Sequence, residues 1–491
     1  MKIIISYPPF ESLSGTPLLG QNRQYQVFSS PTYIYPVVPA SAATLLKKAG
    51  HEVIWNDCIA MGWTYARFLD FIKKEKPDII AFETKTPVVQ FHWKIISDLK
   101  KMSEGAWKLK TVLFGDHVTA LPEESMRESV VDYVLTGGDY DFLLLNLCES
   151  FKRAPQEQTG YFEPGIYYRV KTDIKNSGKF ILNHDLDAEP FIDRDLTRWD
   201  LYALKNGNFK RTPGTYIMSG RDCWYHECKF CSWPTLYPQF RCRSPHNVLD
   251  EIGQLIEKYA VREIMDDTGT FPIGDWLKIF CEGVVKRGFN RKVYLDCNMR
   301  FGVLKLEDYQ MMKNANFRLL LFGLESASQS TLDRLKKGVK VQQVIEGCRM
   351  ARKAGLFPHI TIMFGYPWET FEDACKTLKL GRWLLDKGYA YTMQATMVIP
   401  YPGSPLFREC DEQKLLLTKD WEAYDMKHPV MKTSLTDIQI KNMVQGMYNA
   451  AFSPAYILKR ISSVRDLDDL KYIGRTVGKV LGHLIDFKKN N

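Results

Sequence analysis

Short apolar strands alternate with helical segments in two separate stretches of this 491-residue chain, and no other feature constrains its fold as strongly. Consecutive strands joined by a helix of about ten residues run parallel, and the crossover between them is right-handed. The first stretch predicts a doubly wound, Rossmann-like parallel sheet. The second contains six strands separated by helical segments and predicts a partial (β/α)6 barrel, open on one side. We therefore expect an α/β protein.

A segment that mixes Gly, Pro, Asn and charged residues lies between the two stretches and predicts a linker. We expect a first domain at residues 1–153, a linker with a hairpin at 154–210, the barrel at 211–415 and a helical region at 416–491. A chain of this length is too long for one ordinary core, which agrees with two or three domains.

The composition is that of a soluble globular protein, with 45% hydrophobic and 25% charged residues. We find no apolar run of about eighteen residues and no leader at the first residues, so we expect a cytoplasmic enzyme. Eleven cysteines, an odd number and mostly isolated in apolar segments, favour a reducing compartment. The net charge of +9 is scattered along the chain, so it indicates no nucleic-acid partner.

Three cysteines within nine residues, Cys223, Cys228 and Cys231, predict a metal site after the first strand of the barrel. Three thiolates leave a tetrahedral zinc ion one ligand short, and they leave one iron of a four-iron cluster without a protein ligand. A substrate or cofactor can bind at such an open position. A zinc knuckle is the alternative, but no second Cys/His pair stands at zinc-ribbon spacing.

The Cys-x2-Cys pair, with Phe230 inside it and a third cysteine upstream, resembles the cluster loop of the radical S-adenosylmethionine (SAM) superfamily. In that superfamily three cysteines hold a [4Fe-4S] cluster, and SAM chelates the fourth iron. The usual spacing is Cys-x3-Cys-x2-Cys, whereas four residues separate Cys223 from Cys228 here. Cys242 therefore remains the alternative to Cys223 as the third ligand.

The resemblance also implies a SAM site at the ends of the later barrel strands. Asp267 would bind the amino group of SAM, because an acidic residue suits that cation, and Arg300 would pair with its carboxylate. Glu325 and Ser326 would contact the ribose hydroxyls, and Phe230 would press on the adenine. The order of these groups along the chain supports the resemblance more than any one of them does.

The first domain resembles the cobalamin-binding domain that precedes the radical SAM domain in the cobalamin-dependent subfamily. It shares a proline pair after the first strand, a segment from Pro39 to His51, and the residues from Leu121 to Glu124. Ligands of doubly wound sheets sit at the carboxyl ends of the strands. The residues expected to contact cobalamin there are Pro8, Pro9, Gly115, Asp116, His117, Thr119, Gly137 and Gly138.

His117 lies in the loop that supplies an axial histidine in other cobalamin proteins, but the Asp-x-His-x-x-Gly signature is missing. Axial ligation of cobalt and a loop histidine bonded to the backbone are therefore both open. A generic Rossmann-type nucleotide domain is a further alternative for this region. It is weakened because no Gly-x-Gly-x-x-Gly follows the first strand.

The resemblance implies an enzyme with three cofactors: a [4Fe-4S] cluster, SAM and cobalamin. It would generate a 5′-deoxyadenosyl radical from SAM and methylate an unactivated carbon of an apolar small molecule, such as a lipid or a tetrapyrrole. It would need a one-electron reductant such as flavodoxin or ferredoxin. Two alternatives stay open: a cyclase or rearrangement enzyme that uses cobalamin without methyl transfer, and a non-catalytic cobalamin-binding sensor. The sequence assigns no catalytic acid, base or nucleophile.

Residues 467 to 487 predict an amphipathic helix near the end of the chain. One side would carry Leu470, Ile473, Val477, Val480, Leu481 and Leu484, and basic residues recur at every fourth position at Lys471, Arg475, Lys479 and His483. Such a helix can dock on its own protein or lie on an anionic membrane, so a peripheral membrane contact is one expectation.

Overall fold

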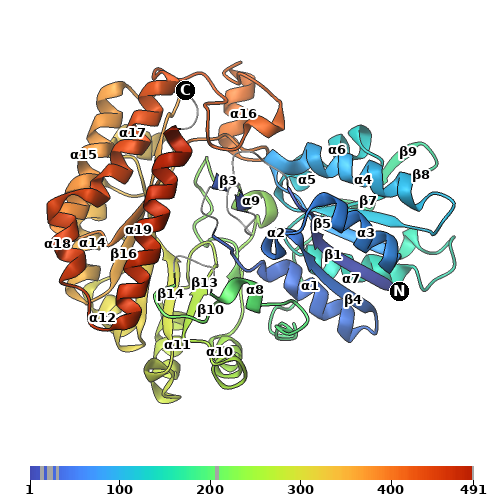
Figure 1. Ribbon diagram of the computed structural model, residues 1–491, viewed down its shortest axis with the longest axis horizontal. Helices are drawn as coiled ribbons and strands as arrows, with labels where there is room; N and C mark the ends of the chain where they lie inside the picture. The colour runs from blue at the N-terminus through green and yellow to red at the C-terminus, as the bar shows by residue number, and fades with distance from the viewer. Residues whose placement is uncertain (11–15, 19–25, 29–31, 205–208, 489–491) are drawn as a thin grey trace.

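The computed structural model describes residues 1–10, 16–18, 26–28, 32–204 and 209–488. Two parallel sheets lie side by side, each with its own covering helices, and the last helices of the chain run across the second sheet (Figure 1). This arrangement confirms the predicted α/β class and the predicted order of a doubly wound sheet followed by a partial barrel.

Five parallel strands form the first sheet in the order β4-β1-β5-β6-β7, with bounds Glu52–Asp57, Lys2–Tyr7, Ile79–Glu83, Lys110–Phe114 and Tyr133–Leu135. The hairpin of β8 (Ile166–Val170) and β9 (Asp173–Asn176) adds two antiparallel strands beside β7. The sheet therefore continues into the predicted linker. The strand order reverses between β1 and β5, and sheets of this kind bind ligands at such a switch point.

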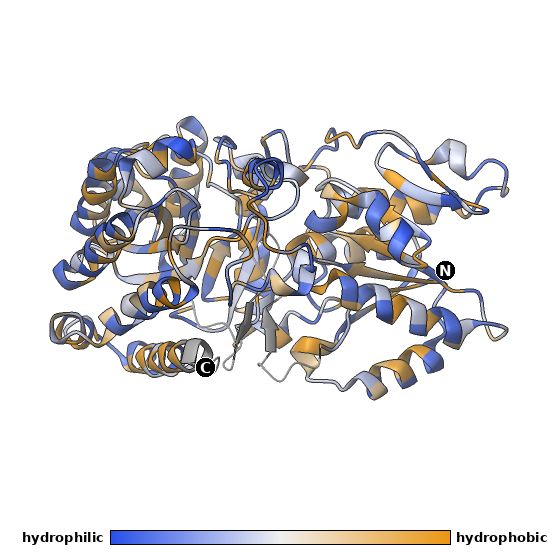
Figure 2. Cartoon of the chain, turned by 90° about the horizontal axis from the view of Figure 1, so that it is seen from above, coloured by the Kyte–Doolittle hydropathy of each residue, from blue (hydrophilic) through white to orange (hydrophobic). Residues whose placement is uncertain are grey.

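Both faces of this sheet are buried. Ile3 and Ile5 face one hydrophobic cluster and Ile4 faces another, so the run Ile3-Ile4-Ile5 is apolar at every position. Figure 2 shows the hydrophobic colour concentrated on these strands, whereas the helices are coloured in both shades. The helices of this part are α1 (Val37–Lys48), α2 (Cys58–Met61), α3 (Tyr65–Glu75), α4 (Val89–Ser103), α5 (Asp116–Ala120), α6 (Pro122–Glu128) and α7 (Tyr140–Ser150).

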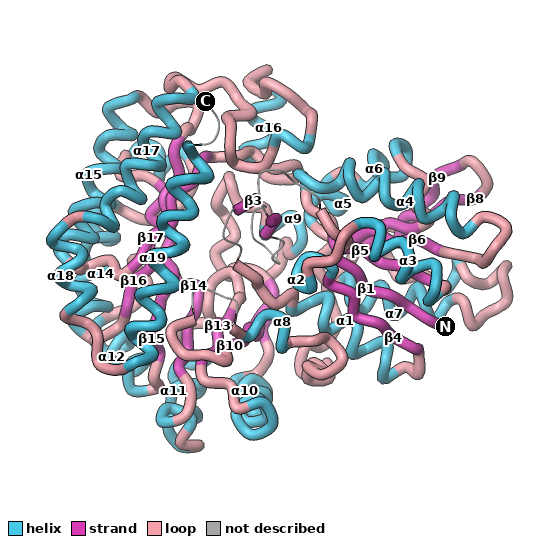
Figure 3. The backbone as a smooth tube through the Cα atoms, viewed as in Figure 1, coloured by secondary structure: helices cyan, strands magenta, loops and turns pink. Residues whose placement is uncertain are grey.

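The second sheet has six parallel strands in chain order (Figure 3), namely β10 (Gly214–Ile217), β13 (Glu263–Asp266), β14 (Tyr294–Met299), β15 (Phe317–Glu325), β16 (Phe357–Phe364) and β17 (Thr392–Met397). No pairing joins β10 to β17 within the described ranges, so the barrel is open there. Its outer helices are α10 (Pro245–Tyr259), α11 (Asp275–Lys286), α12 (Leu306–Asn314), α13 (Gln329–Arg334), α14 (Val341–Lys353) and α15 (Phe371–Lys387).

Local sequence signals set the ends of these helices. Ser244 precedes α10 and its hydroxyl accepts a hydrogen bond from the Asn247 amide, while Thr370 and Asp373 form a reciprocal capping box at the start of α15. Gly388 ends α15 in the left-handed conformation that glycine adopts without steric cost. Each cap satisfies backbone groups that the helix itself leaves unpaired.

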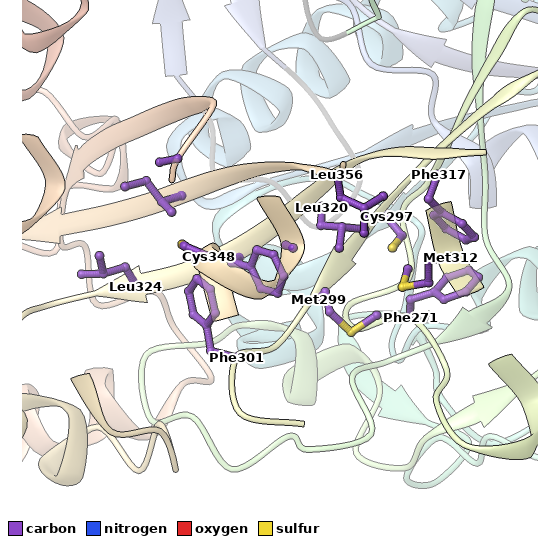
Figure 4. Close-up of a cluster of buried hydrophobic side chains, with 14 of the residues drawn as sticks. Phe271, Cys297, Met299, Phe301, Met312, Phe317, Leu320, Leu324, Cys348 and Leu356 are labelled. Carbon is purple, nitrogen blue, oxygen red and sulfur yellow. The ribbon is translucent and has the colours of Figure 1, made fainter. Parts of the chain in front are cut away.

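A hydrophobic cluster fills the space between the barrel strands and their outer helices (Figure 4). Phe301 stacks on Phe322 with ring centroids 4.2 Å apart. Cys297 and Cys348 lie in this cluster with 0% of their surface exposed. These isolated cysteines are buried core thiols, as predicted, and all eleven cysteines of the chain are free.

The helical C-terminal region packs on the barrel. Helix α17 lies against α15 and β17, and α19 runs along the barrel strands (Figure 1). No helix among the described residues is long and apolar enough to cross a membrane. The helices of the C-terminal region are α16 (Pro405–Glu412), α17 (Asp437–Asn449), α18 (Pro454–Ile461) and α19 (Leu467–Lys488).

The predicted faces of α19 are partly wrong. Leu470, Val477 and Leu481, expected to share the docking side, are 54%, 44% and 47% exposed. Tyr472, which the hydrophobic pattern left out, is buried instead against Leu319 of β15. Ion pairs orient the helix: the carboxylate of Asp469 in its first turn meets Lys210 and Arg211 of the segment before β10.

A buried ion cluster joins the two sheets. Arg221, two residues before the first cysteine of the cysteine-rich loop, has its Nη1 2.9 Å from Asp139 Oδ1 and its Nη2 2.5 Å from Asp141 Oδ2. Its Nη2 also lies 3.1 Å from Glu189 Oε2, and Arg241 Nη2 lies 2.5 Å from Asp139 Oδ1. The guanidinium of Arg221 therefore fixes the start of the cysteine loop to the N-terminal end of α7.

Replacing Arg221 with methionine should destabilise the protein by about 3–5 kcal/mol, because the buried carboxylate of Asp141 would lose its cation, while Asp139 would keep only Arg241 and His184. The free energy of unfolding, measured by urea titration, reports this loss. The matched control is Arg127→Met on α6, whose pairing with Glu123 is solvent-exposed and should contribute nothing measurable. Equal stability of the Arg221 variant and the native protein would contradict the role assigned to this cluster.

Candidate active site at the carboxyl ends of the barrel strands

A cavity of about 420 Å³ opens at the carboxyl ends of the barrel strands and continues along the inner side of the sheet. The side chains of Cys223, Cys228 and Cys231 all line it. Parallel barrels place their active sites at this end, because the loops that follow the strands meet there. The sequence thus brings its three closely spaced cysteines to the one edge where barrel chemistry occurs.

The cysteine loop follows β10 and is held by the loop that follows β13. The backbone of Cys223 pairs with that of Thr270, and its Sγ lies 2.9 Å from Thr270 Oγ1. The amide of Cys231 donates to the carbonyl of Cys228 at 3.2 Å, which forms a tight turn between them. The turn holds Cys228 and Cys231, and the backbone bridge to Thr270 holds Cys223. All three side chains therefore face the same cavity. No group of three Cys, His, Asp or Glu side chains in the described part of the chain gathers around a single ion position.

The extra residue between Cys223 and Cys228 is accommodated by left-handed backbone. Asp222 has φ +89° and His226 has φ +32°, and His226 Nδ1 lies 3.1 Å from the Cys223 carbonyl oxygen. Cys242 lies elsewhere: it is exposed on β12 (Arg241–Cys242), pairs with Gly220 of β11 (Gly220–Arg221), and is absent from the cavity lining.

Burial disfavours the thiolate form of these cysteines unless a positively charged partner binds them. Burial raises the pKa of Cys228, and the cations of Lys337 and Arg300 oppose that rise. Burial also raises the pKa of Cys231 well above its ordinary value. Arg300 Nη1 lies 3.9 Å from Cys228 Sγ. Thiolates here need an electrophilic partner, and the donor set fits a thiolate-bound iron–sulfur cluster.

Four of the five predicted SAM residues line the cavity: Phe230, Asp267, Arg300 and Glu325. The fifth, Ser326, does not. Its hydroxyl is buried and donates to Glu369 Oε1 at 2.5 Å. The side chain is turned away because Glu325 and Ser326 are adjacent at a strand end, so the two do not point the same way.

Arg300 is fixed on both sides. Its Nη2 donates to the Lys337 carbonyl at 2.6 Å, and its guanidinium carbon lies 3.4 Å from the ring centre of Tyr225. Its Nε is buried without a hydrogen-bond partner in the part of the chain that the structure describes. A buried donor of this kind favours an anionic group beside it.

Glu325 occupies strained backbone. Its φ is +62°, and the pairing of β15 with β16 shifts between Gly323 and Glu325. The carboxylate accepts a hydrogen bond of 2.7 Å from Lys337 Nζ. Sequence reasoning missed Lys337, because it lies in the loop after α13 and follows no strand. Strained non-glycine backbone is typical of functional positions.

At the first sheet, charged residues gather at the switch point between β1 and β5. The hydroxyl of Tyr7 donates to Glu83, and Lys85 Nζ lies 3.3 Å from Glu83 Oε1 and 3.9 Å from Asp116 Oδ2. Burial lowers the pKa of Lys85, but Asp116, Glu83 and Asp267 of the barrel outweigh it and raise that pKa. The strand-end pattern did not single out Glu83 and Lys85. The switch point of the first sheet thus faces the β13 loop.

None of the eight predicted cobalamin residues lines the cavity, whose lining from the first part of the chain consists of Thr32 and Ile34. Pro8 and Pro9 are buried at the end of β1. Thr119 Oγ1 donates to the Gly115 carbonyl at 2.7 Å and accepts from the Gly137 amide at 3.0 Å, so it ties the β6 and β7 loops together.

Other atoms of the chain lie directly against the glycines of these loops, so no open space is left beside them. A Cβ on Gly138 would lie 1.8 Å from the ring of Tyr237, and one on Gly137 would lie 2.5 Å from the ring of Phe180. A Cβ on Gly115 would lie 2.3 Å from the carbonyl oxygen of Thr84. The prediction that glycine permits a close approach holds, but the approaching groups in this structure belong to the chain itself.

His117 is buried and bonded at both ring nitrogens. Nδ1 lies 3.1 Å from Thr86 Oγ1, and Nε2 lies 3.1 Å from Glu124 Oε2. The ring also packs edge-on against Trp421, with centroids 5.2 Å apart. Both ring nitrogens of His117 are therefore engaged by side chains of the chain itself, and not by the expected backbone.

Residues 217–381 match the Radical SAM superfamily. An uncharacterized methyltransferase of Pyrococcus horikoshii is 27% identical over 470 residues, which are 94% of this chain and 95% of the relative. The anaerobic magnesium-protoporphyrin IX monomethyl ester cyclase of Cereibacter sphaeroides is 25% identical over 457 residues, which are 91% of this chain and 70% of the relative.

Among solved structures, the fold is similar to that of the radical SAM methyltransferase TsrM from Kitasatospora setae, with cobalamin and a [4Fe-4S] cluster bound. The TM-score is 0.68 at 13% identity, and the match covers 98% of this chain and 99% of TsrM. The predicted fold is thereby confirmed. The superfamily match at residues 217–381 includes the cysteine loop and most of the strands and loops that line the cavity, so this part of the chain is a radical SAM domain.

Proposed function

We propose that this protein is a cobalamin-dependent radical SAM enzyme that methylates an unactivated carbon of a small molecule. The observation that carries the proposal is the convergence of Cys223, Cys228 and Cys231 on one cavity with Asp267 and Arg300. The methyltransferase relative along almost the whole chain supports methyl transfer, and the two-sheet fold shared with cobalamin-bound TsrM supports cobalamin.

In this proposal Cys223 is the third cluster ligand and Cys242 is not. Cys223 lines the cavity with the other two cysteines, whereas Cys242 is exposed on β12. His226, which lies between Cys223 and Cys228, has left-handed backbone and accommodates the additional residue of the loop. The unusual spacing is therefore compatible with three ligands in a single loop.

The cysteine assignment predicts that Cys242→Ala retains about four iron and four sulfide per chain after anaerobic reconstitution, while Cys223→Ala loses the intact cluster. The cluster content of each variant is measured by iron and sulfide analysis and by the visible charge-transfer absorbance from thiolate to iron. The two alanine variants are matched in chemistry and differ only in position. Cluster loss in the Cys242 variant and retention in the Cys223 variant would reverse the assignment.

When bound, the reduced cluster, SAM and cobalamin supply one-electron cleavage of a carbon–sulfur bond and a transferable methyl group. The chain's own residues orient the reactants and exclude water. We assign Arg300 to the carboxylate of SAM, because its buried Nε needs an acceptor. Asp267 and Glu325 are assigned to the amino group and the ribose, and Phe230 to the adenine. Ser326 has no part in this site.

For cobalamin we propose the carboxyl edge of the first sheet at the β1/β5 switch point, with Pro8, Pro9, Gly115, Asp116 and Thr119 as neighbours. Glu83 and Lys85 join them, because they lie at the same edge and face the β13 loop. His117 is not proposed as an axial ligand, since both of its ring nitrogens are engaged. Gly137 and Gly138 would contact cobalamin only if the rings of Phe180 and Tyr237 moved away.

A second candidate is ring formation without methyl transfer, which the cyclase relative of Cereibacter sphaeroides favours because it aligns with 91% of this chain. Its name also supports a tetrapyrrole as the substrate class. Product mass separates the two reactions, since methylation adds one CH2. A non-catalytic sensor is disfavoured by the cysteine set of the cavity.

The central test is anaerobic incubation of the reconstituted protein with cobalamin, SAM and a reductant, either chemical or reduced flavodoxin. We expect both 5′-deoxyadenosine and S-adenosylhomocysteine by mass spectrometry from the native protein. The Cys228→Ala, Cys231→Ala double variant should form no 5′-deoxyadenosine, because the cluster is lost. 5′-Deoxyadenosine alone would favour ring formation, and neither product with corrinoid bound would favour the sensor.

We also propose that the protein is cytoplasmic and touches an anionic membrane through α18 and α19. Large apolar side chains on these two helices are 40% to 73% exposed, although such side chains are usually buried. The exposed Lys471 lies among them on α19 and suits anionic lipid headgroups. The exposed set is Ile457, Leu458, Ile461, Leu467, Leu470, Val477 and Leu481.

Flotation with phosphatidylserine-containing vesicles tests this contact. The native protein should float with the vesicles, and Leu458→Glu, Ile461→Glu should release most of it, because the two carboxylates oppose insertion and repel anionic lipid. Val130→Glu changes an apolar residue that is 50% exposed beside the first sheet and should leave flotation unchanged. Native protein that stays at the bottom of the gradient would refute the membrane contact.

A further inference from the structure

The part of the cavity furthest from the cysteines is a polar chamber. Leu321, His359 and Thr392 pair across β15, β16 and β17 and form one layer of its wall. The next layer toward the cysteines pairs Gly323, Thr361 and Gln394. Filled barrels carry bulky branched residues at such positions. A hollow wall that offers imidazole, hydroxyl and amide groups is suited to a ligand with polar groups of its own.

Helix α19 forms the opposite wall of this chamber. Tyr472, Thr476, Lys479 and Val480 line the cavity, and their spacing of four, three and one residues places them on one side of the helix. The Nζ of Lys479 donates to the hydroxyl of Thr32. The ammonium group of a lysine on a surface helix normally extends into water. The ammonium group of Lys479 instead points into the cavity, where a binding partner would explain its position.

Charge in the cavity is balanced near the cysteines and unbalanced in the chamber. The lining carries two carboxylates, Asp267 and Glu325, and both lie on the loops near the cysteines, together with the cations Arg300 and Lys337. Among the side chains that the structure describes, no carboxylate pairs with Lys479, and its helix neighbour Arg475 is also a cation. The chamber therefore carries a net positive charge.

An ammonium group held in this way lowers the stability of the empty protein. Burial, and then repulsion from Arg475, lower the pKa of Lys479 to about 8. Binding an anion beside it would recover that free energy, because the charged ammonium would gain a partner. An anionic ligand group is thus the missing partner of this chamber.

We propose that Lys479 binds an acidic group of the substrate, a carboxylate or a phosphate, and that the β16 and β17 side chains orient the molecule so that its reacting carbon faces the cysteine loop. That the bound molecule is a substrate rests on the proposed function. That an anion binds beside Lys479 rests on the cavity alone. It narrows the substrate from an apolar molecule to one that has an apolar body and an acidic group.

The experiment uses three probes with the same twelve-carbon chain: dodecanoate, dodecyl phosphate and dodecanol. Calorimetric titration into the full-length protein without SAM or reductant should show at least one acid binding about tenfold more tightly than the alcohol. Lys479→Met keeps the length of the side chain and should abolish the preference, while Lys479→Arg should retain it. Lys353→Met, which removes an exposed lysine at the end of α14, is the control and should change nothing.

Preference for dodecanoate alone would identify a carboxylate, and preference for dodecyl phosphate alone would identify a phosphate. Equal affinity for all three probes, no binding of either acid, or a preference that survives Lys479→Met would overturn the proposal. The titration is repeated on the Cys228→Ala, Cys231→Ala variant, which lacks radical chemistry. Retained anion preference in that variant separates failure of the catalytic proposal from failure of the anion site, and thermal unfolding confirms that each variant is folded.

Discussion

The relative position of the two sheets depends on one buried cation, the guanidinium of Arg221. Arg221 stands between the first barrel strand and the cysteine loop, and its guanidinium is surrounded by carboxylates from α7 and from the segment after the hairpin. A guanidinium can satisfy several acceptors at fixed angles, so it sets orientation as well as distance. The position of the cysteine loop relative to the first sheet follows from this contact, and so does the approach of Lys85 toward Asp267.

Parallel pairing explains why the remaining functional groups meet. In each sheet every strand runs the same way through its parallel part, so the loops that follow the strands share one edge. That rule allowed the sequence to predict both sheets, the position of the cysteine loop and four further residues that line the cavity, without knowledge of tertiary structure. The prediction required only which residues end a strand, and alternating strands and helices reveal those ends clearly.

The failures have physical causes of their own. Hydrophobic periodicity shows which residues of α19 share a side, but Tyr472 and the ion pair of Asp469 decide which side is covered. Glycine at 137 and 138 signals a close approach without telling whether a cofactor or an aromatic ring approaches. Lys337 and Lys479 enter the cavity from a loop and from a distant helix, so no strand-end pattern contains them. Ser326 was misplaced because adjacent residues at a strand end point in different directions.

The irregular backbone at Glu325 has a consequence for how this enzyme tolerates change. A left-handed conformation costs a residue with a Cβ about 1–3 kcal/mol, and glycine would not bear that cost. Glu325→Gly would therefore relax the strand while it removes the carboxylate that Lys337 holds. The ammonium of Lys337 would then lie buried without its partner, which costs about 3–5 kcal/mol and exceeds the strain relieved. The strained backbone at Glu325 is therefore maintained by the ion pair that its carboxylate makes.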